Sequence, residues 1–368
     1  MKLVRDVARN EVMPYVAAAD KAGECPRELY QWGFDLGLHM VQIPEQFGGM
    51  GLSYETCAMM FEELAWVDAA YADTFVTNFV AFRNILLNGT EEQARHFVEK
   101  TENNGFAAFC LTEANAGSDV AAMRTTAVLD GDEYVLNGTK TFITSSKGVK
   151  WLVIMAKNAD DPSVFTEFMV DMTKPGVELG PLNKLGLRMD SCCEVYLNDV
   201  ELEESDIFGK EGNGFNRGIG DFNFERWLVG ACDYGTAICA YEDALKHANT
   251  REAFGKTIGR FQLNQLKIAE MTIKLDAMKN MLYETAWKAD MNGGNLDAGE
   301  AAMCKYFCAN ASFKVVDDAM QIMGGIAVAS EHRINRIWRD LRVDRISGGT
   351  DEMMILTTAK NALKKYRQ

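Results

Sequence analysis

The residue pattern of this chain changes twice, and this alternation limits the possible folds more than any other feature. Near residue 106 helical periodicity gives way to short apolar runs, and near residue 212 it returns. Between these points the step Asp130-Gly131 divides an apolar run at 128–136, and Asn137-Gly138 follows at once. Both steps favour the positive φ angles of tight hairpin turns. We therefore predict an antiparallel β domain over residues 106–208, flanked by helices.

The remaining regions predict helices on both sides of this domain. Further strands are expected at 106–111, 139–144, 151–156, 165–171 and 195–197, and long helices at 222–250, 261–290, 297–323 and 351–365. Four long helices near the C-terminus are typical of a bundle. Residues 1–105 have helical periodicity that Pro14 and residues 44–51 interrupt. Since 368 residues exceed the roughly 250–300 of a single core, we predict three domains, 1–105, 106–208 and 209–368.

Charge and hydropathy exclude several classes of function. The chain has 38 Lys and Arg against 53 Asp and Glu, a formal charge of −15, which argues against nucleic acid or an anionic membrane as a partner. We find no apolar run of transmembrane length. The N-terminal segment MKLVRDVARNEVMPYV carries early acidic residues and no apolar h-region, so we do not expect a signal peptide.

The cysteines and histidines indicate neither disulfides nor a metal centre. The nine cysteines are an odd number and form no CxxC pair, as expected for buried thiols in a reducing cytoplasm. The four histidines are isolated from one another, so we expect no metal site. The tripeptide Gly255-Lys256-Thr257 lacks the earlier glycine of a phosphate-binding loop, because residue 250 is threonine. The glycine-rich segment at 209–218 lacks dinucleotide-binding spacing and suggests a junction between domains.

Four segments, in the right order along the chain, resemble the signatures of the acyl-CoA dehydrogenase family. The first is LTEANAGSDV at 111–120, and the second is NGTKTFIT at 137–144. The third is REAFGK at 251–256, followed by FQ at 261–262. The fourth is QIMGG at 321–325, followed by RD at 339–340 and GGTDE at 348–352. The resemblance implies a mainly α fold with an N-terminal helical domain, a central antiparallel β-barrel or sandwich domain, and a C-terminal four-helix bundle. The chain starts inside the region that resembles the family's first helix, so we expect that helix to be truncated.

Within the family, several segments are most similar to the crotonobetainyl-CoA reductases of carnitine metabolism. They lie at 184–202, 211–217, 258–263, 279–290, 301–311 and 339–349. The resemblance implies an FAD-dependent oxidoreductase that interconverts a saturated acyl-CoA and its trans-2-enoyl-CoA, here γ-butyrobetainyl-CoA and crotonobetainyl-CoA. A base moves the α-proton while a hydride passes between Cβ and flavin N5. It also implies an electron-transferring flavoprotein as partner and a homotetramer built as a dimer of dimers.

The base is expected at Glu225. Many family members carry it as the glutamate of a Tyr-Glu-Gly-Thr motif, but the matching residues here are Ser347, Gly348, Gly349 and Thr350, and glycine cannot act as a base. Other branches of the family place the base on an earlier helix, and Glu225 resembles the base at that position. Its aromatic neighbours in FNFERW would desolvate the carboxyl group and raise its pKa. A surface glutamate paired with Arg226 is the structural alternative.

The resemblance also implies sites for the cofactor and the substrate. The cofactor-binding candidates are Phe109, Leu111, Thr112, Phe142, Thr144, Arg251, Phe254, Gln262, Gln321, Gly325, Thr350 and Glu352. The substrate-binding candidates are Ser118, Arg226 and Gly348. Arg251, Phe254, Gln262, Gln321 and Gly325 resemble groups that hold FAD across a subunit interface, which requires an oligomer.

Several acyl groups are candidates for the substrate. A trimethylammonium group suits an aromatic or acidic wall. The candidates are Trp66, Tyr71, Phe75, Phe79, Phe82, Phe222 and Trp227, although helical aromatic residues commonly form the core. Aryl-acrylyl-CoA substrates of the cinnamoyl or caffeyl type, or short-chain acyl-CoAs, are alternatives within the family. A non-catalytic flavoprotein scaffold of the same fold is an alternative of another class.

Overall fold

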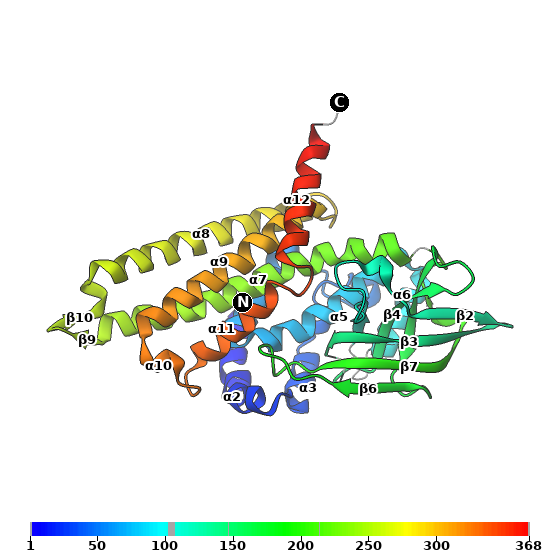
Figure 1. Ribbon diagram of the computed structural model, residues 1–368, viewed down its shortest axis with the longest axis horizontal. Coiled ribbons are helices and arrows are strands. Elements are labelled where there is room, and N and C mark those ends of the chain that lie inside the picture. The colour runs from blue at the N-terminus through cyan, green and yellow to red at the C-terminus, as the bar shows by residue number, and fades with distance from the viewer. Residues whose placement is uncertain (1, 102–106, 146, 213, 367–368) are drawn as a thin grey trace.

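Along the chain, helices precede and follow a central sheet, which confirms the predicted helix–strand–helix order (Figure 1). The computed structural model describes residues 2–101, 107–145, 147–212 and 214–366. In Figure 1 the sheet lies at the right, and the long helices α7, α8 and α9 extend to the left. The predicted domain boundaries remain predictions, and the first of them falls on residues outside the described part.

The N-terminal region is helical, as predicted. It contains α1 (Lys2–Val7), the π-helical turn η1 (Ala8–Val12), α2 (Met13–Ala22), α3 (Arg27–Asp35), η2 (Leu38–Met40), η3 (Glu45–Phe47), α4 (Tyr54–Val67), α5 (Ala69–Asn88) and α6 (Glu91–Thr101). Pro14 was expected to interrupt a helix, but it stands at the start of α2, where its missing N–H group costs least. Thr90 caps α6, since its hydroxyl oxygen accepts a hydrogen bond of 3.2 Å from the Gln93 backbone N–H.

The sheet has eight strands. They are β1 (Ala107–Cys110), β2 (Thr126–Asp130), β3 (Glu133–Thr144), β4 (Trp151–Asn158), β5 (Phe165–Asp171), β6 (Val177–Pro181), β7 (Cys192–Glu203) and β8 (Ile207–Phe208). Seven follow the order β6-β7-β3-β2-β4-β5-β8, and β1 pairs with β4. Most neighbours are antiparallel, as predicted, but β1 and β2 each run parallel to β4. The short 3₁₀ turns η4 (Val120–Ala122) and η5 (Glu204–Asp206) lie between strands.

Only one of the two dipeptides predicted to form hairpin turns does so. Asp130-Gly131 joins β2 to β3, and Gly131 has a φ of +66°. Asn137-Gly138 was expected to form a second turn, but β3 continues through it with a shift of register against β7. Gly138 packs against Thr125 so closely that a Cβ atom would lie 2.4 Å from the Thr125 Oγ1 atom. The glycine therefore serves a bulge and a close approach rather than a turn.

The four predicted C-terminal helices are present; three have the expected bounds to within one residue, and the first begins eight residues earlier than expected. They are α7 (Gly214–Thr250), α8 (Gln262–Met291), α9 (Ala298–Met323) and α12 (Asp351–Lys365). Several short elements that were not predicted lie between these helices. They are the small hairpin of β9 (Glu252–Ala253) and β10 (Lys256–Thr257), η6 (Ile258–Arg260), α10 (Gly325–Val328) and α11 (Arg333–Asp344). Helices α4 and α5 pack against α7, so the N-terminal and C-terminal helices share one core.

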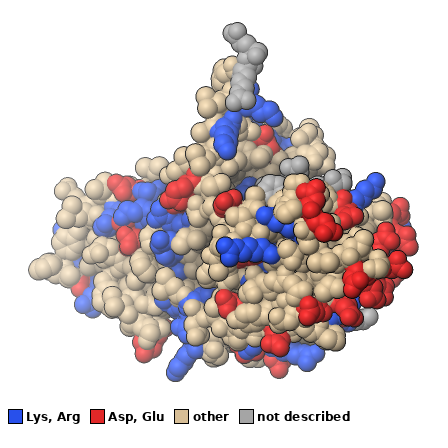
Figure 2. All heavy atoms as spheres, turned by 45° about the vertical axis from the view of Figure 1, so that its right-hand side comes forward, with Lys and Arg blue, Asp and Glu red and all other residues tan. Residues whose placement is uncertain are grey.

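The surface of the molecule is unevenly charged. Asp130, Asp132 and Glu133 at the β2–β3 hairpin are exposed, as are Glu201 and Glu203 on β7 beside it. Figure 2 shows acidic side chains gathered at one end of the face in view and basic ones scattered over the rest. All nine cysteines are buried and free of disulfides. Within the described ranges, we find no helix that is both long enough and apolar enough to span a membrane.

Candidate active site

The carboxyl group of Glu225 faces a loop of two glycines that comes from the other end of the C-terminal region. Glu225 lies on α7 and is half-buried, while Gly348 and Gly349 lie between α11 and α12. A Cβ atom built on Gly348 would stand 3.2 Å from the Glu225 Oε1 atom. Burial raises the pKa of Glu225 to about 7, against the opposing attraction of Arg226 and Lys305. A carboxyl group with this pKa can both accept and donate a proton near neutral pH.

Two basic side chains hold the carbonyl groups of the glycine loop. The Arg226 Nε–H group donates a hydrogen bond of 3.1 Å to the Gly348 carbonyl oxygen, and Nη1 donates one of 2.9 Å to Asn223 Oδ1. The Lys305 Nζ group on α9 donates a hydrogen bond of 2.7 Å to the Gly349 carbonyl oxygen. Arg226 therefore does not pair with Glu225 as a surface glutamate and arginine would; it contacts the loop that Glu225 faces.

The backbone conformation of the loop favours glycine at both positions. Gly348 and Gly349 have φ angles of +60° and +108°, which side-chain-bearing residues rarely adopt. A Cβ atom on Gly349 would also lie 2.6 Å from the Met354 Cε atom. Thr350 follows directly and caps α12, since its hydroxyl accepts a hydrogen bond of 3.4 Å from the Met353 N–H group. Glu352 is exposed in the first turn of α12.

A buried ion pair holds the segment of residues 111–120 against strand β3. Lys140 on β3 is fully buried, and its Nζ atom donates hydrogen bonds of 2.9 Å to Glu113 Oε1 and 3.2 Å to the Leu111 carbonyl. The Thr141 N–H group donates one of 2.8 Å to the Thr112 carbonyl. The structure therefore brings Leu111 and Thr112 next to residues 140–142 of β3, whereas Ser118 is exposed farther along the segment.

Phe142 has an unusual conformation for a strand residue. Its φ angle is +57°, where β3 shifts register between Lys140 and Ile143, and its side chain is 67% exposed. Positive φ at an aromatic residue carries strain and commonly marks a functional site. Thr144, two residues on, is half-buried. An exposed aromatic ring suits stacking on a planar ring system such as isoalloxazine.

Phe109 connects the sheet to the helix that carries Glu225. The rings of Phe109 on β1 and Phe222 on α7 meet edge to face, with centroids 5.3 Å apart. Phe222 lies three residues before Glu225, almost one helical turn away. This contact therefore joins the sheet, with its predicted cofactor residues, to the glutamate of α7.

The remaining predicted cofactor residues lie far from Glu225 in the same chain. Arg251 follows the end of α7, about 25 residues and hence about 37 Å along the helix from Glu225. Phe254 stands in the β9–β10 hairpin and is 96% exposed, Gln262 begins α8, and Gln321 and Gly325 lie near the end of α9 and the start of α10. In Figure 1 the labels β9, β10 and α10 all stand at the left end of the bundle, away from the sheet. One chain therefore forms two separate groups of predicted residues.

Six of the seven aromatic residues suggested for an acyl pocket lie in the hydrophobic core. Trp66, Tyr71, Phe75, Phe79, Phe82 and Trp227 are at most 9% exposed, which favours the core alternative, and only Phe222 is half-buried. The Trp66 ring lies beneath Arg9, at 3.8 Å, and Arg333, at 4.7 Å. This aromatic face is thus already covered by cations of the chain itself.

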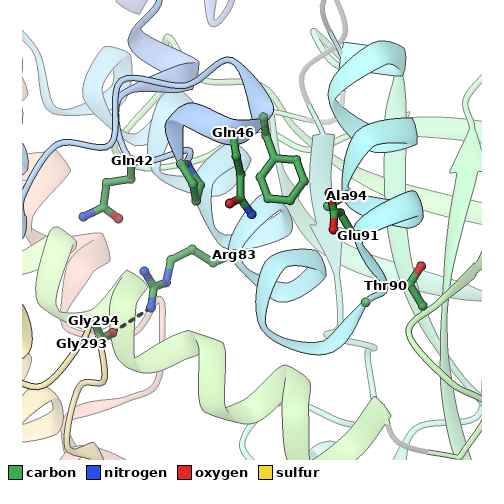
Figure 3. A pocket seen from close by; sticks show the side chains of 11 residues that line it. Gln42, Gln46, Arg83, Thr90, Glu91, Ala94, Gly293 and Gly294 are labelled. Carbon is green, nitrogen blue, oxygen red and sulfur yellow. Dashed lines mark hydrogen bonds between the residues drawn. The ribbon is translucent and has the colours of Figure 1, made fainter.

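A hollow of about 420 Å³ lies beside the C-terminal end of α5 (Figure 3). Its lining includes Gln42, Gln46, Thr90 and Arg83. The Arg83 Nη2 group donates a hydrogen bond of 3.1 Å to the Gly294 carbonyl, and its guanidinium lies 4.7 Å from the centre of the Phe224 ring. None of the residues predicted for cofactor or substrate lines this hollow. Among the described residues we find no group of His, Cys, Asp and Glu side chains able to hold a metal ion.

Comparison with known proteins agrees with this arrangement along the whole chain. Family models match the acyl-CoA dehydrogenase N-terminal domain at residues 1–105, the middle domain at 108–200 and the C-terminal domain at 212–363. The chain belongs to the acyl-CoA dehydrogenase family. Family membership and the solved neighbours together indicate a flavin-dependent dehydrogenase.

Solved structures are similar over almost their full length. Butyryl-CoA dehydrogenase from Megasphaera elsdenii is 29% identical with a TM-score of 0.94, over 98% of this chain and 96% of that one. A chain from a study of the electron-transferring flavoprotein of Acidaminococcus fermentans is 32% identical with a TM-score of 0.94, over 99% and 96%. A glutaryl-CoA dehydrogenase in complex with glutaryl-CoA is 28% identical with a TM-score of 0.92, over 99% and 94%. The butyryl-CoA and glutaryl-CoA dehydrogenases are named for different acyl groups, so these neighbours support the family rather than one substrate.

Sequence reasoning missed several residues of this region. Lys305, Asn223 and the Lys140–Glu113 pair all contact predicted site residues or the segments that carry them. A signal existed for Lys305, because it is a single charged residue within the apolar helix segment AAMCKYFCANA. A lysine in such a segment must find a partner once it is buried.

Proposed function

We propose that this chain is an FAD-dependent acyl-CoA dehydrogenase or enoyl-CoA reductase in which Glu225 transfers the α-proton. The observation that carries the proposal is the 3.2 Å between Glu225 Oε1 and the Cβ position of Gly348. Other branches of the family carry the base at the position of Gly348, and here the Glu225 carboxyl group lies beside that position. We therefore infer that the carboxyl group of Glu225 takes the place of a glutamate side chain at position 348.

The chain's own residues explain how the proton transfer would work. Burial of the Glu225 carboxyl group raises its pKa to about 7. Both its protonated and its ionised form are therefore populated near neutral pH. The diglycine loop exposes backbone groups beside it, and backbone N–H groups stabilise the enolate oxygen that develops when a thioester loses its α-proton. Arg226 fixes this loop through the Gly348 carbonyl oxygen. When bound, FAD supplies the redox chemistry by exchanging a hydride with Cβ of the acyl chain.

The proposed cofactor site draws on two groups of residues. Phe109, Leu111, Thr112, Phe142, Thr144, Thr350 and Glu352 would hold the flavin end. Arg251, Phe254, Gln262, Gln321 and Gly325 would hold the other end from a second subunit. Support for an oligomer comes from exposed apolar side chains on the C-terminal helices, which an isolated chain leaves in water. They include Leu263, Ile273, Trp287, Met291, Ile355, Leu356 and Leu363.

For the substrate we propose γ-butyrobetainyl-CoA and crotonobetainyl-CoA, bound through Ser118, Arg226 and Gly348. Besides the sequence resemblance, an acidic residue on α5, Asp73, supports the proposal. Asp73 is half-buried, and its neighbours Ala72 and Thr74 are buried. Burial raises the pKa of Asp73 well above its ordinary value, and the charges of Asp190 and Asp344 raise it further. A quaternary ammonium group beside Asp73 would favour its ionised form.

An electron-transferring flavoprotein is the proposed partner, and a cytoplasmic location remains a prediction.

The substrate proposal is tested by anaerobic titration of the flavin-loaded protein with three acyl-CoAs. We expect γ-butyrobetainyl-CoA to bleach the flavin absorbance near stoichiometry. Preferential bleaching by 3-phenylpropionyl-CoA would favour the aryl-acrylyl alternative, and by butyryl-CoA the short-chain alternative. A flavin-loaded protein that none of the three reduces would favour the non-catalytic scaffold and contradict the proposal.

A further inference from the structure

Lys305 is a fully buried cation that binds the loop facing Glu225. It lies on α9 with no exposed surface, and its Nζ atom donates the 2.7 Å hydrogen bond to the Gly349 carbonyl oxygen. Burial lowers its pKa, whereas attraction to Asp233, Asp344, Asp351 and Glu225 raises it. An ammonium group in such a place is stable only when nearby negative charge compensates for its lost solvation.

Two buried aspartates supply this compensation and must share a proton. Asp233 on α7 is 0% exposed, and none of the described residues donates a hydrogen bond to either of its carboxyl oxygens. The carboxyl group of Asp344, the last residue of α11, lies within hydrogen-bond reach of it. Two carboxylates are both acceptors, so they bond only when one of them holds a proton. The Ser347 hydroxyl donates a hydrogen bond to Asp344, whereas none of the described residues donates one to Asp233, so the negative charge is better stabilised on Asp344 and Asp233 holds the proton. Burial and the charge of Asp344 raise the pKa of Asp233 in the same sense.

The pair is also connected to the loop through the backbone that follows α11. The Ser347 hydroxyl donates a hydrogen bond of 3.2 Å to Asp344 Oδ1, and Ser347 directly precedes Gly348. Arg226 binds the Gly348 carbonyl and Lys305 binds the Gly349 carbonyl. Because each peptide unit is planar, fixing two successive carbonyl groups fixes the orientation of the N–H groups in the same units. The conformation of the loop beside Glu225 therefore depends on both cations.

We propose that Lys305 is a positioning residue for the proton transfer at Glu225, and that Asp233 and Asp344, sharing one proton, keep its ammonium group on the Gly349 carbonyl oxygen. This inference rests on the proposed function of Glu225. The charged groups that act on Glu225 come from several elements, Arg226 on α7, Lys305 on α9 and Asp344 on α11, with Asp73 on α5 also interacting with it. Loss of the Lys305 charge therefore affects both the loop and the proton affinity of Glu225.

The two aspartates are predicted to respond differently to the same substitution. In Asp233→Asn the amide N–H replaces the carboxylic O–H as donor to Asp344, so the charge beside Lys305 is kept. In Asp344→Asn the negative member of the pair is lost, and Lys305 loses part of its compensation. A merely structural pair of buried aspartates would show no such asymmetry in a readout at the glycine loop.

The test is amide hydrogen exchange, followed by mass spectrometry, of the peptide covering residues 344–354 in the flavin-loaded protein. Lys305→Met and Asp344→Asn should exchange at least tenfold faster than wild type, and Asp233→Asn within threefold of it. Lys314→Met is the matched control, because Lys314 lies on the same helix but pairs with Asp318 at 3.1 Å near the surface, and it should leave this peptide unchanged. If Lys305→Met does not fold, Lys305→Arg and the two aspartate variants still make the comparison.

A second readout separates this inference from the proposed function. The pH midpoint of kcat for butyryl-CoA or γ-butyrobetainyl-CoA should move upward in Lys305→Met, because a nearby cation that favours the Glu225 carboxylate is gone, and Lys305→Arg should restore it. Unchanged exchange in both Lys305→Met and Asp344→Asn, or equal effects of the two asparagine substitutions, would overturn the inference. If Glu225→Gln keeps full activity while the exchange pattern holds, it is the proposed function that fails.

Discussion

Glu225 and Gly348 are 123 positions apart in the sequence, yet the Glu225 Oε1 atom lies 3.2 Å from the point where a Gly348 side chain would begin. A glutamate at position 348 and one at position 225 would therefore compete for nearly the same space. The structure thus brings the carboxyl group of Glu225 next to a position that carries no side chain of its own.

This relationship predicts that the base can be moved. Glu225→Gly should lose almost all turnover, and the double variant Glu225→Gly with Gly348→Glu should recover at least tenfold over it. Recovery will be partial, because φ of +60° at position 348 costs a side-chain-bearing residue about 1–2 kcal/mol. Glu225→Gly with Gly348→Ala carries the same backbone strain without a carboxyl group and is the control. Equal steady-state rates for the two double variants would contradict the prediction.

The pH dependence should have opposite signs in the two directions of the reaction. The pKa of Glu225 is raised to about 7, so its carboxylate accepts the α-proton of a saturated acyl-CoA only as pH rises through that value. Its protonated form supplies the proton for enoyl-CoA reduction, so that rate falls over the same range. Parallel measurements of kcat/KM from pH 5 to 9 in both directions test this, and curves that bend the same way would contradict it.

The same raised pKa affects folding. A carboxyl group whose pKa is higher in the folded protein than in the unfolded chain stabilises the fold below the unfolded value, and this contribution is lost as pH rises through the folded value. Glu225→Gln, which carries no titratable group, should therefore gain in Tm relative to wild type between pH 5 and 8. Thermal unfolding of the flavin-loaded proteins at several pH values measures the difference, and a constant difference would contradict the assignment of this pKa.

The Lys140–Glu113 pair should matter for stability. Both side chains are at most 4% exposed, so Lys140→Met leaves a buried carboxylate without its partner and should lower the free energy of unfolding by about 3–5 kcal/mol. Adding Glu113→Gln should recover part of the loss. Lys147→Met breaks an exposed pair with Glu24 and should cost about 1 kcal/mol or less, which makes it a suitable control in urea unfolding. Equal losses for the two lysine variants would show that burial does not govern the pair.

A cofactor site shared between subunits predicts complementation. Glu225→Gln and Arg251→Glu subunits should each be inactive alone. Co-expressed, they should form mixed dimers in which one of two sites has both native residues, giving about a quarter of wild-type activity if subunits pair at random. No recovery in a preparation proven to contain mixed dimers would mean that each chain builds its own site.

Much of the fold could be predicted because its long elements have strong local patterns. The strand 165–171 and the helix 351–365 have the predicted bounds, and both are uninterrupted runs of one periodicity. The strand β6 was missed because VELGP is short and contains Gly and Pro. The prediction of a turn at Asn137-Gly138 was wrong because local sequence cannot reveal that Thr125 packs against Gly138.

The site could be predicted only in part, because its geometry joins segments far apart in the chain. The family resemblance predicts roles for Glu225 and Gly348 separately, but no local pattern reveals that they face each other. Lys305 and the pair Asp233 and Asp344 were missed because their roles depend on the packing of α7, α9 and α11. The resemblance did place Arg251 in a separate group, and the length of α7 gives the separation, about 37 Å along the helix from Glu225 in one chain.

The most direct test of the account is rapid anaerobic mixing of flavin-loaded wild type and Glu225→Gln with γ-butyrobetainyl-CoA, following the flavin absorbance in a single turnover. The substitution keeps the volume of the side chain and removes the base, so flavin content and fold should be retained. We predict bleaching about 10²–10⁴ times slower in the variant, the range that loss of a general base gives. Bleaching of the variant within threefold of the wild-type rate would contradict the assignment of Glu225 as the base.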